Sequence, residues 1–198
     1  MKPYFEVSHI AGLLLLVIAP AWGMMELAQH SNTFEARKGA TRVRFGGFRL
    51  AVLTCVVVVN LAIYGAPRIA PAAAIRPAPV AFGIGIVVLL AGLVLRGWSF
   101  KALGDYFTFT VMVSSDQPVV TRGPYRVLRH PGYTGVLLAC TGVGLTTANW
   151  LALGVTVVVP LALLLCRIRI EEHALCATLG DRYRRYAAGH KRLVPLVW

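Results

Sequence analysis

The stretch PGYTGVLLACTGVGLTTANWLALGVTVVVPLALLLC, residues 131–166, runs for 36 residues without a charged side chain. A membrane-spanning helix needs roughly 20 mostly apolar residues, so this stretch is too long for one span and about right for two. Its middle, residues 144–150, holds a cluster of small polar side chains and ends on Trp150, which is typical of a turn at the membrane interface. The stretch therefore predicts a transmembrane helical hairpin.

The composition extends this membrane interpretation to the whole chain of 198 residues. Hydrophobic residues make up 57% and charged residues only 14%, whereas a soluble domain carries about a quarter charged residues. The net charge of +12 raises the question of nucleic acid, but no zinc-finger pattern and no basic recognition helix accompany it. Anionic lipid headgroups and the positive-inside rule explain the basic residues more simply, so we expect no nucleic-acid partner.

Three more apolar segments precede the hairpin: Val7–Met25, Leu50–Ala66 and Pro77–Leu95. The residues Ala19–Ala21 resemble a signal-peptidase site, but the apolar run continues past them, so we expect the first segment to be retained as a helix. The sequence thus predicts an all-α polytopic membrane protein with five transmembrane helices, of which the last two form the hairpin.

The basic residues predict the orientation of these spans. Seventeen lysines and arginines fall after the first span, after the third span and in the tail, whereas Lys2, Arg68 and Arg76 fall on the opposite side. The positive-inside rule then places the N-terminus outside and the C-terminus in the cytosol. Any chemistry is expected at the cytosolic face, on the polar segments 96–135 and 167–192 that flank the hairpin.

Part of the first polar segment has the pattern of β-structure. Residues 107–113 alternate apolar with polar side chains and are rich in aromatic and β-branched types. Residues 114–118 carry a turn signal, and residues 119–121 offer a second short strand. The pattern predicts a short β-hairpin at the membrane interface.

The sequence RGPYRVLRHPGYTG, residues 122–135, leads directly into the hairpin. Pro124 and Pro131 each hold the preceding residue out of helical geometry, and Pro131 suits the first turn of a helix. In one interpretation the arginines reach lipid phosphates, and we expect this role for Arg122. In the other the segment is a binding site, because rigidly held Arg, His and Tyr side chains stand beside a helix N-terminus that favours a carboxylate.

The second polar segment, from residue 167, predicts an amphipathic helix with a kink at Gly180. Its apolar stripe consists of Leu175, Leu179, Tyr183 and Tyr186. Its basic face, which we expect to contact anionic lipid headgroups, consists of Arg182, Arg184, Arg185, Lys191 and Arg192. Arg167 and Glu171 share one helix face, as a simple ion pair would, but ionisable groups at the edge of a span are functional candidates by default.

Together the two polar segments resemble the isoprenylcysteine carboxyl methyltransferase family of integral membrane enzymes, and its relatives among the phospholipid N-methyltransferases. The first half of the family pattern stands here as Gly123-Pro124-Tyr125-Arg126, Arg129-His130-Pro131, Tyr133 and Gly135. The second half stands as Arg167-Ile168, Glu171-Glu172, Leu175, Gly180, Tyr183 and Tyr186. One departure is Leu179, where the family usually has Phe. The two halves flank a hairpin of the right length.

The resemblance implies a methyl donor, S-adenosylmethionine, held on the cytosolic side. Residues 1–95 would form a three-helix transmembrane scaffold, and residues 96–198 the cofactor-binding and catalytic region with the amphipathic helix as its lid. The catalytic residues implied are Arg167, Glu171 and Arg96. The cofactor-binding residues implied are Gly123, Pro124, Tyr125, Arg129, His130, Pro131, Tyr133, Gly135, Glu172 and Tyr183.

The acceptor implied is lipophilic, enters from the bilayer and carries a carboxylate, which Arg167 or Arg96 would hold. An amine acceptor, as in phospholipid N-methylation, would instead need Glu171 or His130 to remove a proton. Prenylated protein, quinone-like lipid, fatty acid and phospholipid all remain candidate acceptors. A non-catalytic transporter or assembly protein is the alternative class, although the spans show no internal repeat and almost no charge. No metal site is expected, since the four cysteines lie far apart and form no CxxC pair.

Overall fold

The computed structural model describes residues 2–9, 11–14, 16–17, 24, 41–42, 47–106, 112–113 and 117–195. Most of these residues are helical. The helices are α1 (Tyr4–Val7), α3 (Phe48–Ile69), α4 (Ala78–Leu103), α5 (Pro131–Thr146), α6 (Trp150–Leu179) and α7 (Asp181–Gly189). Shorter elements among the described residues are the 3-10 helices η1 (Pro71–Ala73), η2 (Gly104–Tyr106) and η3 (Gly123–Arg126) and the strands β1 (Thr41–Arg42) and β2 (Met112–Val113).

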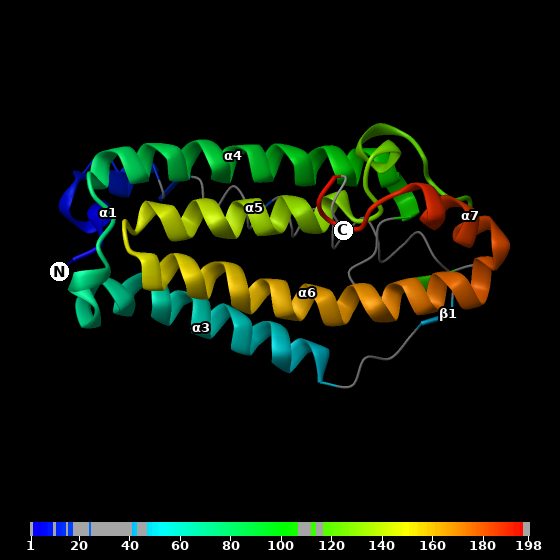
Figure 1. Ribbon diagram of the computed structural model, residues 1–198, viewed down its shortest axis with the longest axis horizontal. Coiled ribbons are helices and arrows are strands. Elements are labelled where there is room, and N and C mark those ends of the chain that lie inside the picture. Colours follow the sequence, from blue (N-terminus) through cyan, green and yellow to red (C-terminus); the bar gives the residue numbers. More distant parts are fainter. Residues whose placement is uncertain are drawn as a thin grey trace.

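Four long helices lie side by side in the order α4, α5, α6, α3 and form the body of the molecule (Figure 1). A turn at residues 147–149 joins α5 to α6. The helical hairpin predicted from the uncharged stretch is therefore confirmed, and its turn falls within the predicted residues 144–150.

Asn149 begins α6 and attaches the turn to α3. Its Oδ1 accepts from the backbone nitrogens of Leu151 at 3.0 Å and Ala152 at 3.2 Å, which have no partner within the helix. Its Nδ2 donates to the carbonyl oxygen of Ala70, just after α3, at 2.9 Å. One side chain thus sets the start of α6 and joins it to the neighbouring helix.

Three of the described helical segments are long and apolar enough to cross a membrane: Leu50–Ile69, Ala78–Leu103 and Trp150–Leu179. They contain the second, third and fifth predicted spans. The first predicted span, Val7–Met25, lies largely outside the described residues. α6 continues without a break past Cys166, so the charged residues that follow stand on the same helix as the span.

The helices α4 and α5 approach so closely that their backbones touch. A Cβ atom on Gly142 of α5 would lie 2.4 Å from the nitrogen of Leu89 and 2.6 Å from the carbonyl oxygen of Gly85 on α4. Farther along the contact, a Cβ on Gly92 would lie 2.5 Å from the nitrogen of Ala139. Such contacts require residues without side-chain bulk, as is common between membrane helices.

The C-terminal helix breaks where the sequence predicts a kink. Gly180 adopts a φ of 55°, in the left-handed region that favours glycine, and it separates α6 from α7. The predicted apolar stripe faces the protein, because Leu179 and Tyr183 are buried in a cluster with Val113 and Ala174. α7 is therefore an amphipathic helix that packs on its own chain.

The predicted β-hairpin of residues 107–121 is wrong in its second strand, and residues 107–111 and 114–116 lie outside the described residues. Met112–Val113 pairs antiparallel with Thr41–Arg42, a segment far away in the sequence. Residues 117–121 form no strand. The alternating pattern correctly indicated extended backbone at 112–113, but alternation does not determine which segment supplies the hydrogen-bond partner. Val113 is buried in a cluster with residues of α6 and α7.

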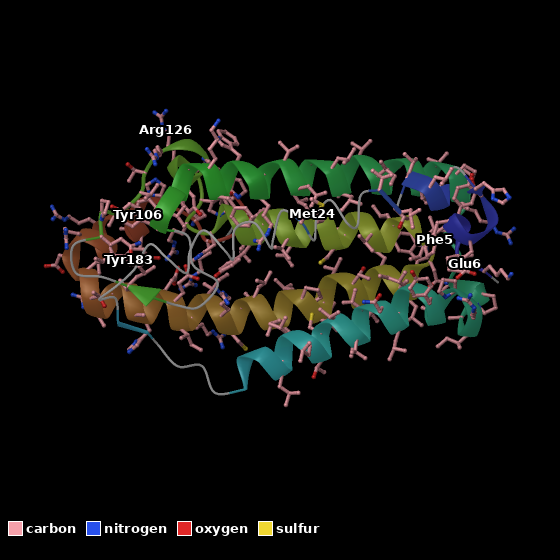
Figure 2. All side chains as sticks on the ribbon, turned by 180° about the vertical axis from the view of Figure 1, so that it is seen from behind. Phe5, Glu6, Met24, Tyr106, Arg126 and Tyr183 are labelled. Carbon is pink, nitrogen blue, oxygen red and sulfur yellow. The ribbon has the colours of Figure 1, made fainter. Side chains whose placement is uncertain are left out.

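The two ends of the helical bundle carry different elements. Tyr106, Arg126 and Tyr183 lie at one end, and Phe5 and Glu6 lie at the other (Figure 2). At the second end, Arg68 of α3 pairs with Glu6 of α1 at 2.8 Å. The first end gathers the end of α4, the start of α5, the end of α6 and α7 (Figure 1).

Candidate active site

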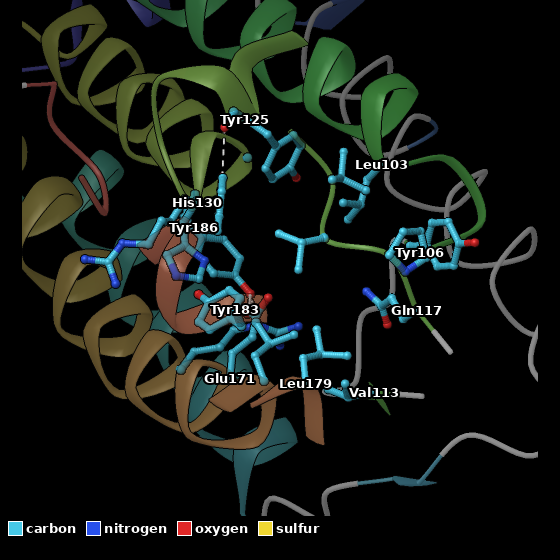
Figure 3. A pocket seen from close by; sticks show the side chains of 18 of the residues that line it. Leu103, Tyr106, Val113, Gln117, Tyr125, His130, Glu171, Leu179, Tyr183 and Tyr186 are labelled. Atoms are coloured by element: carbon cyan, nitrogen blue, oxygen red, sulfur yellow. Dashed lines mark hydrogen bonds between the residues drawn. The ribbon is translucent and has the colours of Figure 1, made fainter. Parts of the chain in front are cut away.

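A cavity opens at the end of the bundle where α4, α5, α6 and α7 converge (Figure 3). It contains about 900 Å³ of space free of protein atoms, and this space includes a part that is open to solvent. Its polar wall consists of Arg96, Tyr125, Arg129, His130, Tyr133, Arg167, Glu171, Tyr183 and Tyr186. Further lining residues are Leu103, Tyr106, Val113, Gln117, Pro118, Val119, Val120, Gly132, Leu175 and Leu179.

The structure brings both halves of the sequence pattern to this one cavity. The residues expected to be catalytic all line it: Arg96, Arg167 and Glu171. Of the residues expected to bind a cofactor, those that line it are Tyr125, Arg129, His130, Tyr133 and Tyr183. Those that lie outside its wall are Gly123, Pro124, Pro131, Gly135 and Glu172.

The residues outside the wall position the residues that form it. Pro124 is buried in η3, and Pro131 is the first residue of α5. Gly135 faces α4 instead of the cavity, where its Cβ would lie 2.8 Å from the carbonyl oxygen of Gly92. These residues place the backbone that carries the lining side chains.

Tyr133 connects the two charged residues that α6 places on one face. The Nε of Arg167 donates to the Tyr133 hydroxyl at 2.6 Å, and the hydroxyl donates to Oε2 of Glu171 at 2.5 Å. The spacing of four residues along α6 brings the guanidinium and the carboxylate together, and α5 inserts the phenol between them. The two charges are therefore linked through a neutral hydroxyl at the cavity wall.

Arg96 supplies a further guanidinium from α4. Its side chain is buried, its Nη1 donates to the carbonyl oxygen of Gly132 at 3.0 Å, and its Cζ lies 4.6 Å from the centroid of the Phe100 ring. The close contact between α4 and α5 makes this geometry possible. Arg96 and Arg167 both line the cavity, and paired guanidinium groups are well suited to hold a carboxylate.

Glu172, next to Glu171 in the sequence, has a different environment. Its Oε1 accepts from Nη1 of Arg129 at 2.7 Å and lies 3.3 Å from Nε2 of His130, and its Oε2 lies 2.9 Å from Nη2 of Arg192. This carboxylate lies outside the cavity wall and is held by Arg129, His130 and Arg192. It orients two of the side chains that do line the cavity, Arg129 and His130.

Tyrosines from η3 and α7 complete the polar wall. The Tyr186 hydroxyl donates to the carbonyl oxygen of Tyr125 at 2.8 Å and lies 3.2 Å from that of Leu128, which attaches α7 to η3. Burial raises the pKa of Tyr186 to about 12, and it raises the pKa values of Tyr125 and Tyr183 further. These phenols therefore stay protonated at neutral pH and act as hydrogen-bond donors.

Two buried polar atoms of lining residues have no hydrogen-bond partner within the part of the chain that the structure describes. They are the hydroxyl of Tyr183 and the Nε of Arg129. A buried donor left without a partner costs about 1–3 kcal/mol, and native proteins contain few of them. Both atoms belong to residues that line the cavity.

Two of the arginines that were expected to contact lipid also have partners within the protein. Arg192 binds Glu172, and the Nε of Arg122 donates to the carbonyl oxygen of Ala102, near the end of α4, at 2.8 Å. The charge pattern could not distinguish these cases, because a lipid phosphate and a protein acceptor attract the same guanidinium group. The lining residues at 117–120 were also missed, since no motif marks them.

A comparison with known families shows to which family the chain belongs. A family model described as phospholipid methyltransferase matches residues 80–182, slightly more than half of the chain. The chain belongs to the phospholipid methyltransferase family. The matched range begins in α4 and ends in α7, so it includes the cavity's arginines, the first half of the sequence pattern, the hairpin and the second half of the pattern as far as Gly180.

The relatives of this family member include isoprenylcysteine methyltransferases. Protein-S-isoprenylcysteine O-methyltransferase B of Arabidopsis thaliana is 30% identical over 115 residues, which cover 57% of this chain and 58% of that protein. The protein-S-isoprenylcysteine O-methyltransferase of Tribolium castaneum is 32% identical over 105 residues, which cover 52% of this chain and 37% of that protein. The resemblance found in the sequence pattern is thereby confirmed.

A solved structure extends the similarity to the fold. The eukaryotic intramembrane Ras methyltransferase, an isoprenylcysteine carboxyl methyltransferase, aligns with a TM-score of 0.60 at 25% identity and covers 78% of this chain. The alignment takes in 55% of that chain. This family member therefore spans less than two thirds of the length of the relatives that it matches.

Proposed function

We propose that this chain transfers a methyl group from S-adenosylmethionine to a lipophilic acceptor in the membrane, and that the acceptor is a carboxylate. The observation that carries the proposal is the placement of Arg96 and Arg167 beside Glu171 in the wall of one cavity. Relatives named as isoprenylcysteine O-methyltransferases, and the fold shared with an isoprenylcysteine carboxyl methyltransferase, support it.

The residues present fit the proposed cofactor. Aromatic and polar side chains line the cavity together, and two of the lining residues carry donors without partners among the described residues, the Tyr183 hydroxyl and the Arg129 Nε, which suit a ligand rich in oxygen and nitrogen acceptors. We propose that Tyr125, Arg129, His130 and Tyr183 hold it and that α7 covers it. When bound, S-adenosylmethionine would supply an electrophilic methyl group on a sulfonium.

The chain's own residues would supply alignment and charge. Methyl transfer is an in-line displacement, so the main tasks are to position the acceptor and to exclude water. Arg96 and Arg167 would hold the acceptor carboxylate through charge-assisted hydrogen bonds. Tyr133 would keep Arg167 and Glu171 in place from the α5 side. A carboxylate is already ionised at neutral pH, so this reaction needs no base.

Methylation of an amine is the weaker alternative. It would require a group that removes a proton, and Glu171 is the carboxylate at the cavity wall. However, Oε2 of Glu171 already accepts a hydrogen bond from the Tyr133 hydroxyl at 2.5 Å. Nothing about the cavity requires a base, whereas its two arginines match an anionic acceptor.

We further propose the arrangement of the chain in the membrane. It has five spans, the N-terminus lies outside, and the C-terminus and the cavity lie at the cytosolic face; the distribution of basic residues supports this orientation. Residues 1–95 serve as scaffold, and residues 96–198 carry the cofactor and the chemistry. The exposed arginines Arg182, Arg184 and Arg185 of α7 would contact anionic lipid headgroups, and the acceptor would enter from the bilayer.

Calorimetry with S-adenosylmethionine tests the proposal on protein purified in detergent. We expect the wild type and His173→Ala to bind equally, because His173 is an exposed residue of α6. We expect His130→Ala to bind on the order of tenfold more weakly, because it removes a side chain of the cavity wall that bonds Glu172. Absence of binding by the wild type would contradict the proposed function.

A further inference from the structure

Residues 190–194, which follow α7, form a strap along the RHP motif of residues 129–131. The backbone nitrogen of Arg129 donates to the carbonyl oxygen of Lys191 at 2.7 Å, and that of His130 donates to the carbonyl oxygen of Arg192 at 3.0 Å. The Thr134 hydroxyl donates to the carbonyl oxygen of Leu193 at 2.8 Å. The strap therefore replaces water as the hydrogen-bond partner of the backbone that enters α5.

The side chain of Arg192 reaches from this strap to α6. Its Nε lies 3.0 Å and its Nη2 lies 2.9 Å from the same oxygen, Oε2 of Glu172. The other carboxylate oxygen, Oε1, accepts hydrogen bonds from Nη1 of Arg129 and Nε2 of His130. The hydrogen bond and the charge of Glu172 raise the pKa of Arg192. Strap, RHP motif and α6 thus meet at one carboxylate.

This geometry restricts the tautomer and the ring orientation of His130. An ionised carboxylate only accepts hydrogen bonds, so Nε2 of His130 must carry the proton that faces Glu172. In the neutral ring Nδ1 is then an acceptor. The ring also stacks on Tyr133, with centroids 5.4 Å apart and an interplanar angle of 10°. Orientation and tautomer of His130 both depend on where Glu172 is held.

From these contacts we infer that Arg192 is a positioning residue for the cofactor site, acting through Glu172 on Arg129 and His130; the inference rests on the proposed function. Arg192 does not line the cavity, whereas the two residues that it orients do. With Arg192 removed, Glu172 would keep its contacts to Arg129 and His130 but lose the partner that fixes Oε2. The carboxylate would then rotate, and both lining side chains would move with it.

The neighbouring Lys191 provides a matched control. Its side chain is exposed, and a change to glutamine removes the same unit of positive charge one residue away. We expect Arg192→Gln to weaken binding of S-adenosylmethionine on the order of tenfold, while Lys191→Gln stays within about twofold of the wild type. In turnover, KM for the cofactor should rise in Arg192→Gln while kcat at saturating cofactor changes little.

Arg192→Lys and thermal unfolding separate positioning from folding. Lysine keeps the charge but cannot place two nitrogens on Oε2, so we expect an intermediate loss of affinity of about threefold in a variant that folds. A lower unfolding temperature together with unchanged affinity in Arg192→Gln or Arg192→Lys would show a purely structural role and overturn the inference.

Calorimetry of the wild type, Lys191→Gln and Arg192→Gln with S-adenosylmethionine decides the question. Weaker binding by Arg192→Gln alone supports the inference. Equal binding by the three proteins contradicts the inference and leaves the proposed function intact. Absence of binding by the wild type contradicts the proposed function and, with it, the inference.

Discussion

The turn end and the cavity end of the α5–α6 hairpin differ in whether their buried polar groups have hydrogen-bond partners. At the turn, Thr146, Thr147 and Asn149 are buried, and each side chain has a hydrogen-bond partner within the protein. At the cavity, the Tyr183 hydroxyl and the Arg129 Nε are buried without a partner among the described residues. The hairpin thus has one end whose buried polar side chains are bonded within the protein, and another end beside donors without partners among the described residues, on α7 and just before α5.

The difference separates what stabilises this protein from what we propose to be its chemistry. Polar residues within a membrane protein have to be satisfied, because no water is available in the hydrocarbon region. The turn meets this requirement by itself. The cavity end meets it only in part, and we propose that a bound ligand supplies the remaining partners. Substitutions at the turn should therefore change stability, and substitutions at the cavity should change binding or turnover.

Arg167→Gln should have the largest effect on turnover. It removes the guanidinium proposed to hold the acceptor, and loss of one such charge-stabilising donor typically costs about 100-fold or more in kcat. Arg169, two residues along α6, is exposed, and Arg169→Gln is the matched control with unchanged turnover. Steady-state kinetics measures both variants. Turnover by Arg167→Gln within about threefold of the control would contradict the role of this residue.

Gly142→Ala tests the close contact of α4 and α5. The new Cβ would lie 2.4 Å from a backbone nitrogen, so the helices would have to separate, at a cost of about 2–3 kcal/mol of unfolding free energy. Gly154→Ala on α6 places its Cβ in open space and should stabilise the helix by about 0.5–1 kcal/mol. Unfolding in detergent compares the two. Equal stability would show that the contact tolerates a methyl group.

Asn149→Ala tests the turn end of the hairpin. It removes the cap of α6 and the bond to the Ala70 carbonyl, so we expect a loss of about 1–2 kcal/mol in unfolding free energy. Asn60 is the control, because this exposed residue of α3 donates only to Val56 on its own helix. Affinity for S-adenosylmethionine should be unchanged in both folded variants. A selective loss of affinity in Asn149→Ala would mean that the two ends are coupled.

Tyr183→Phe should have the smallest effect, and this effect should be on cofactor affinity and not on stability. The Tyr183 hydroxyl has no partner among the described residues, so its removal should leave stability unchanged or slightly higher, whereas affinity for the cofactor should fall about three- to fivefold. Tyr186→Phe should behave in the opposite sense, because that hydroxyl already bonds the Tyr125 carbonyl. Thermal unfolding and calorimetry on both variants measure the contrast. A destabilised Tyr183→Phe would show that the hydroxyl has a partner within the protein.

Local features of the fold could be predicted from the sequence. The uncharged stretch 131–166 with its polar middle predicted the hairpin, because apolar length and turn chemistry are local properties. Gly180 predicted the break between α6 and α7 for the same reason, since only the backbone of that residue has to adopt a positive φ. The i,i+4 spacing likewise placed Arg167 and Glu171 on one face of α6.

Partners across the fold could not be predicted. Alternation at 112–113 indicated a strand, but its partner, Thr41–Arg42, comes from a distant segment. The basic face of the C-terminal segment included Arg192, but its sequence did not indicate that this arginine pairs with Glu172. Tyr133 was expected to contact the cofactor, and nothing in its motif showed that its hydroxyl bridges Arg167 and Glu171. Each of these contacts depends on how separate helices pack.

The most direct test of the proposed methyl transfer uses purified protein, methyl-labelled S-adenosylmethionine and three acceptors offered in parallel: a prenylcysteine analogue, a fatty acid and phosphatidylethanolamine. A methyl ester releases its label as methanol in alkali, whereas a methylated amine does not. We predict alkali-labile label on a carboxylate acceptor, lost in Arg167→Gln and retained in Arg169→Gln. Label that enters only phosphatidylethanolamine, in an alkali-stable form, would contradict the proposal.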